Sequence, residues 1–82
     1  GHIYKAEQIG KKIIISWNID HPFYQKLISE NIENEKVIQI VDFLFYTLAS
    51  AQIQYMADDD DKVCIMDNII STMSANMRNL LS

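Results

Sequence analysis

Asn34–Met56, with the sequence NEKVIQIVDFLFYTLASAQIQYM, is the stretch that decides the fold. Alternating spacings of four and three place one set of its apolar residues on a single face of an α-helix: Val37, Val41, Leu44, Leu48, Ala51 and Tyr55. A second apolar set fills most of the remaining circumference: Ile38, Ile40, Phe43, Phe45 and Tyr46. A helix that is apolar nearly all round lies inside something. We therefore expect a long central helix, covered by the rest of the chain and by a partner.

Length, charge and cysteine content limit what the chain can be. Its 82 residues make one domain, near the lower limit at which a single core is stable. The net charge is −4 and the seven basic residues are scattered, whereas nucleic acid and anionic membranes need clustered Lys and Arg. No uninterrupted apolar run approaches the roughly 20 residues of a membrane span. We expect neither partner, and the single Cys64 fits a reducing, cytoplasmic location.

The start of the chain indicates a hairpin. The opening Gly-His suggests that residues 1–2 are a tag remnant, so residues 3–82 are expected to form a single domain taken from a longer protein. Residues 3–9 and 12–19 are predicted strands, joined around Gly10, which can take the positive φ of a tight turn. A lone hairpin is marginal in water. It must therefore lie on the helices, or join strands from upstream sequence or from a second copy.

Three helices are predicted after the hairpin. Pro22 is well placed in a first helical turn, with Asp20 or His21 as the N-cap, and this helix covers about residues 22–30. Asn34 caps the central helix. The run Asp58–Asp61 separates it from a last amphipathic helix over residues 62–81, whose polar face includes Ser74. The order β-β-α-α-α predicts an α+β fold, an N-terminal β-hairpin packed against three α-helices.

His21 is the residue that most invites a chemical role. A histidine beside Asp20 suggests a base or a metal ligand, but adjacent residues on a turn do not converge on one point. We expect His21 to serve the start of a helix instead. The alternative is a freestanding small-ligand-binding domain or enzyme that uses a pocket around Trp17, His21 and Phe23.

The other candidate residues favour structural roles. Cys64 follows an acidic run, whereas a nucleophilic cysteine needs cationic neighbours, so we expect a plain buried or half-buried thiol. The aspartate run lacks the spacing, the central Gly and the distal Glu of a calcium loop. With glycine only at positions 1 and 10, a glycine-rich phosphate loop is ruled out. No catalytic, cofactor-binding or metal-ligating residue is predicted. The methionines suit core or interface packing.

Two segments resemble a known family. The passage Asn18–Tyr24, which follows a strand and reads Asn-x-x-His-Pro-Phe-Tyr before a helix, resembles a passage near the C-terminus of bacterial ATP-binding proteins. These proteins belong to the histidine-kinase/gyrase-B/heat-shock-chaperone (GHKL-type) ATPase superfamily. Asp42–Ala51 resembles their next helix, although Gln52 stands where an acidic residue often follows. The resemblance covers roughly residues 12–81.

The resemblance implies a function without catalysis in this chain. The superfamily's nucleotide-binding signatures, an Asn on a helix and an Asp-x-Gly-x-Gly loop, do not occur here. ATP and Mg²⁺ are therefore implied only for an upstream domain. The chain is expected to be a C-terminal self-association or partner-binding module of a larger chaperone-like or MutL-like ATPase.

The surplus of apolar residues points to the same kind of role. Large exposed apolar patches mark interfaces, and a symmetric homodimer is the default for such a surface. The expected interface residues lie on one face of the central helix and on the last helix: Val37, Val41, Leu44, Leu48, Met73 and Met77. The opposite face of the central helix stays open as the alternative.

Overall fold

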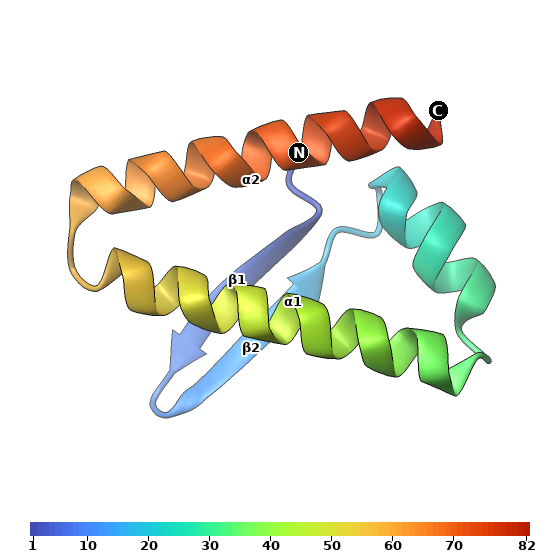
Figure 1. Cartoon of the computed structure of the whole chain (residues 1–82), viewed down its shortest axis with the longest axis horizontal. Coiled ribbons are helices and arrows are strands. Elements are labelled where there is room, and N and C mark those ends of the chain that lie inside the picture. Colours follow the sequence, from blue (N-terminus) through green and yellow to red (C-terminus); the bar gives the residue numbers. More distant parts are fainter.

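The computed structural model describes all residues, 1–82. Its elements are the strands β1 (Tyr4–Ile9) and β2 (Lys12–Trp17), the short helices η1 (Phe23–Ile28) and η2 (Ser29–Asn31), and the long helices α1 (Glu35–Met56) and α2 (Asp60–Leu81). Because η1 and η2 form one continuous helical segment, the chain is a hairpin followed by three helices, and the predicted α+β fold is confirmed. Figure 1 shows α1 crossing the hairpin and α2 running antiparallel to α1.

The hairpin has the predicted turn but a shorter second strand. β1 and β2 pair antiparallel, from Tyr4 opposite Trp17 to Ile9 opposite Lys12, and Gly10 has a φ of 62° at the turn. The strand stops at Trp17 because Asn18 begins a turn. Its side-chain Oδ1 accepts a hydrogen bond from the backbone N–H of Asp20 at 3.0 Å, and its carbonyl accepts one from His21 N–H at 3.0 Å.

The helices begin where polar side chains satisfy their first N–H groups. The Asn34 side chain accepts a hydrogen bond from the N–H of Val37, as predicted for the cap of α1. α2 starts two residues earlier than predicted because Asp59 accepts hydrogen bonds from the N–H groups of Asp61 and Lys62, at 3.0 and 3.2 Å. The segment after Pro22 is a π-helix followed by a 3₁₀ turn, not the regular α-helix that was expected.

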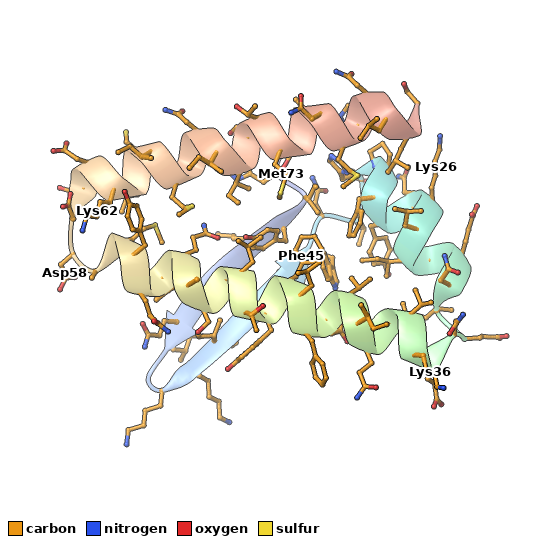
Figure 2. All side chains as sticks on the ribbon, viewed as in Figure 1. Lys26, Lys36, Phe45, Asp58, Lys62 and Met73 are labelled. Carbon is orange, nitrogen blue, oxygen red and sulfur yellow. The ribbon has the colours of Figure 1, made fainter.

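Four aromatic rings form the centre of the core, with Phe45 of α1 in the middle. The centroid of the Phe45 ring lies 5.0 Å from Trp17, 5.3 Å from Phe23 and 5.4 Å from Tyr4. Figure 2 shows Phe45 pointing from α1 toward the middle of the molecule, where Met73 points from α2. The remaining buried apolar residues surround this cluster: Ile3, Ile28, Ala49 and Ile70. The core therefore joins both strands and every long helix.

The rest of the chain covers only one side of α1. Of its 22 residues, only Phe45 and Ala49 are buried. The molecule is thin, with extents of 37 × 28 × 16 Å, so it has no further layer to place over the outer side of α1. The chain itself therefore covers only part of this apolar helix, and the expected cover by a partner stays a prediction for the rest.

Candidate functional site

An open apolar groove lies between β2 and α1. Its volume is about 460 Å³, and it is lined by three residues from each element: Ile13, Ile15, Trp17, Asp42, Phe43 and Tyr46. Alternation along β2 points every second side chain toward α1. Phe43 and Tyr46, three residues apart, share a flank of the helix. The exposed fraction is 64 % for Phe43 and 49 % for Tyr46, so much of this apolar surface faces solvent.

The groove borders a free edge of the sheet. β1 and β2 are the only strands, so the other edge of β2 has no partner. Asn18 N–H donates to the Ile3 carbonyl at 2.9 Å. This bond shows which residues of β2 direct their backbone groups toward β1. Because bonded and non-bonded pairs alternate in an antiparallel ladder, Lys12, Ile14 and Ser16 direct their backbone groups to β1. The backbone groups of the remaining residues point to the open edge: Ile13, Ile15 and Trp17.

The structure divides the predicted interface residues into two groups. Val37 and Leu44 are exposed, with exposed fractions of 37 % and 61 %. The others are half-buried and pack against the core: Val41, Leu48, Met73 and Met77. The predicted face is thus partly occupied by the chain itself. The groove residues Phe43 and Tyr46, on another side of α1, were not in the predicted set. Their signal was present in the second apolar set of the helix.

His21 has a structural place in a buried polar junction. It is fully buried, and its Nδ1 accepts a hydrogen bond from Phe23 N–H at 3.0 Å. Because Nδ1 accepts, Nε2 carries the proton and donates to the Ser74 carbonyl at 2.9 Å. Both ring nitrogens are therefore occupied, and neither is free to act on a ligand. The neighbouring Asp20 is exposed on the turn.

Ser74 joins the same junction, although the sequence pattern placed it on the polar face of the last helix. It is buried, its Oγ accepts from Ile3 N–H at 2.9 Å, and its hydroxyl donates to the Ile70 carbonyl at 2.7 Å. Ser74 follows Ile70 by four residues and precedes Met77 by three, so the helical period itself puts it inside the apolar stripe. No buried side-chain nitrogen or oxygen lacks a hydrogen-bond partner.

The alternative pocket around Trp17, His21 and Phe23 is occupied by the core. The rings of Trp17 and Phe23 lie 5.8 Å apart and both contact Phe45, while His21 has no exposed surface. Trp17 meets solvent only on its other side, in the groove beside β2. The residues of the proposed pocket hold the elements together and leave no opening among them for a ligand.

The remaining candidate residues are spread over the surface. Cys64 is exposed, which corrects the expectation of a buried or half-buried thiol. No group of three or more His, Cys, Asp or Glu side chains is placed to hold a metal ion. Gly10, with a φ of 62°, serves the hairpin turn. Burial raises the pKa of the Tyr4 phenol, whose hydroxyl donates to Gln52 Oε1 at 2.7 Å.

α1 is also long and apolar enough to cross a membrane, judged by length and composition alone. Polar residues interrupt the apolar ones along α1, so its sequence contains no apolar run as long as a membrane span. One such helix is weak evidence, because a helix that packs against protein passes the same test. Its apolar side chains form the core on one side, around Phe45, and reach solvent on the others.

Comparisons with known proteins give no match: no protein-family model, curated protein or solved structure is similar to this chain. The residues of the Asn18–Tyr24 passage can still be placed in the structure. Asn18 organises the turn after β2, and His21 ties the start of η1 to α2. These two positions serve the fold. The surface that the fold leaves open includes the groove beside β2 and the outer side of α1.

Proposed function

We propose that this chain is a non-catalytic self-association module, the C-terminal part of a larger GHKL-type ATPase. The observation that carries the proposal is the amount of exposed surface. The accessible area is 5961 Å² for a mass of 9.5 kDa. Compact monomers of that mass expose about 5,050 Å². The excess of roughly 900 Å² is close to the ~800 Å² that each partner buries in a standard protein–protein interface.

The excess surface is apolar where α1 faces outward. Ile40, Phe43 and Leu44 have exposed fractions of 66 %, 64 % and 61 %. Exposed apolar patches larger than a few hundred Å² are rare on soluble monomers and mark interaction sites. The acidic net charge of −4 makes a polyanion a poor fit to this surface. Protein surface of similar apolar character is the better complement.

The two side chains that could do chemistry, His21 and Cys64, are placed in ways that favour a binding role for the chain. Both nitrogens of the buried His21 are used inside the fold. Cys64 lies on α2 in the turn after the acidic residues Asp60 and Asp61, which is the wrong electrostatic setting for a nucleophilic thiolate. The link to the ATPase superfamily rests on the Asn18–Tyr24 passage. Its test is the full-length sequence upstream of residue 3, where an ATPase fingerprint is expected.

Sedimentation equilibrium tests the self-association directly. We expect a dimer at tens of micromolar, with dissociation on dilution into the low micromolar range. A chain that remains monomeric throughout would overturn the proposal. A melting temperature that rises with protein concentration is the companion result, because association with a second copy stabilises the folded state by mass action.

A further inference from the structure

We propose that the partner is a second copy of this chain and that the two β2 strands pair edge to edge around a two-fold axis. The joined strands form a four-stranded antiparallel sheet. Phe43 and Tyr46 of each copy then cover the joint from the α1 side. This inference rests on the proposed self-association and specifies its surface, since the groove and the free edge of β2 are continuous with each other.

The edge of β2 is open to another strand. The backbone N–H and C=O groups of Ile13, Ile15 and Trp17 point away from β1, and the chain supplies no partner for them. Proteins usually protect such an edge with a charge, a proline, a bulge or a covering segment. The only charge of β2 is Lys12 at its first position. From Ile13 to Trp17 the strand reads IIISW, with neither a charge nor a proline, and its pairing with β1 is unbroken.

The edge of β1 is protected by comparison. Its exposed side chains include the charged Lys5 and Glu7, whose Nζ and Oε1 atoms lie 3.9 Å apart. Its open side borders a second hollow, of about 480 Å³, whose lining includes Gln52 of α1 and Asp67 of α2. A strand added there would meet polar and charged groups. The two edges of the hairpin therefore differ, and the apolar one is β2.

The directions of the backbone groups select the register. Residues that exchange hydrogen bonds across the joint must both direct their groups outward. A two-fold axis at Ile15 pairs Ile15 with its copy and Ile13 with Trp17 of the other copy, so all three outward residues are used. The side chains of these pairs share the face toward α1. Such β-branched and aromatic cross-strand pairs are favourable.

A second copy suits this surface better than a charged segment does. Asp42 is the only charged residue that lines the groove, so a partner strand with an acidic residue, or with more than one basic residue, would bury a charge without a counter-ion. The copy of β2 brings only apolar side chains to the groove side. An isologous interface uses the same patch twice. The excess of roughly 900 Å² per copy matches the ~800 Å² that each partner of a stable dimer buries.

A pair of lysine variants tests the surface. Phe43 and Leu44 are neighbours with nearly equal exposed fractions, 64 % and 61 %, but only Phe43 lines the groove. We expect Phe43→Lys to raise the dimer dissociation constant at least tenfold in sedimentation equilibrium, and Leu44→Lys to change it less than threefold. Because both side chains face solvent in the monomer, circular dichroism should show both variants folded. The reverse order of effects would move the interface to the other face of α1.

Amide hydrogen exchange tests the edge pairing without a substitution. As the concentration rises through the dissociation constant, the amides of Ile13, Ile15 and Trp17 should become protected. The amides of Ile14 and Ser16 are directed to β1 in the monomer and serve as the internal control. A dimer in which the three edge amides still exchange freely overturns the edge pairing and leaves self-association standing. A monomer at every concentration overturns both.

Discussion

Two regions of the molecule treat their polar and apolar groups in opposite ways. Where β1, η1 and α2 meet, the buried side chains of Ser74 and His21 together make four hydrogen bonds, each with a backbone group. Along β2 the outward backbone groups have no partner in the chain, and on the adjoining flank of α1 the side chains of Phe43 and Tyr46 are exposed. The first region is complete in one copy. The second region is the one where we propose that the chain meets another surface.

Two phenylalanines on α1 give the largest expected contrast between the regions. Phe45 is buried among three other rings, whereas Phe43 is 64 % exposed. We expect Phe45→Ala to lower the free energy of unfolding by about 3–5 kcal/mol. Since a small domain has only about 5 kcal/mol in total, this variant should keep at most about 2 kcal/mol of it. Phe43→Ala should stay within about 0.5 kcal/mol of the parent, as surface substitutions do.

Urea denaturation at low micromolar concentration is the measurement for this pair, because dilution removes any stabilisation by a partner. Equal losses in the two variants would show that the flank of α1 bearing Phe43 is part of the monomer core. A loss of stability in Phe43→Ala that is absent at low concentration and appears only at higher concentration would locate that side chain in the dimer interface.

The sequence was sufficient for the architecture because its strongest signals are periodic. Alternation along Ile13–Trp17 identified β2, and the apolar pattern after Asn34 identified α1 together with its cap. The π-helix at Phe23–Ile28 could not be predicted, because one shifted hydrogen-bond register leaves no mark on the periodicity of six residues. β2 ends at Trp17 and not at residue 19, because the turn at Asn18 depends on a side-chain hydrogen bond that the alternation of residues does not indicate.

The site was harder to predict than the fold. The apolar content of α1 indicated an interface. Which side of the helix remains uncovered depends on how the hairpin packs across it, and this is set by tertiary contacts. The burial of Ser74 depends likewise on the N–H of Ile3, which is 71 positions away in the chain. The sequence therefore predicted that α1 carries apolar residues for an interface, and the structure was needed to show which of them are exposed.

Ser74→Ala sharpens the contrast at the complete region. The substitution leaves Ile3 N–H buried without its acceptor, and an unsatisfied buried donor costs about 1–3 kcal/mol. Ser71→Ala on the same helix is the control. Ser71 is exposed and its Oγ makes a solvent-exposed hydrogen bond of 2.7 Å with Nε2 of His2, so we expect a change below about 0.5 kcal/mol. Thermal unfolding of both variants is the measurement. A Ser74→Ala variant as stable as the control would show that water replaces the lost acceptor.

Asp59 at the start of α2 gives the smallest expected effect, because its hydrogen bonds are in partial contact with solvent. The Asp59 carboxylate accepts from the N–H groups of Asp61 and Lys62. Asp59→Ala should cost about 1 kcal/mol, the usual loss for a helix N-cap. Asp59→Asn retains an oxygen acceptor and removes the charge, so its cost should be limited to the few tenths of a kcal/mol of the interaction with the helix dipole. Denaturation at low and high salt separates the two terms, since only the charge interaction is screened. If Asn costs as much as Ala at low salt and both losses vanish at high salt, the cap acts through its charge and not through its hydrogen bonds.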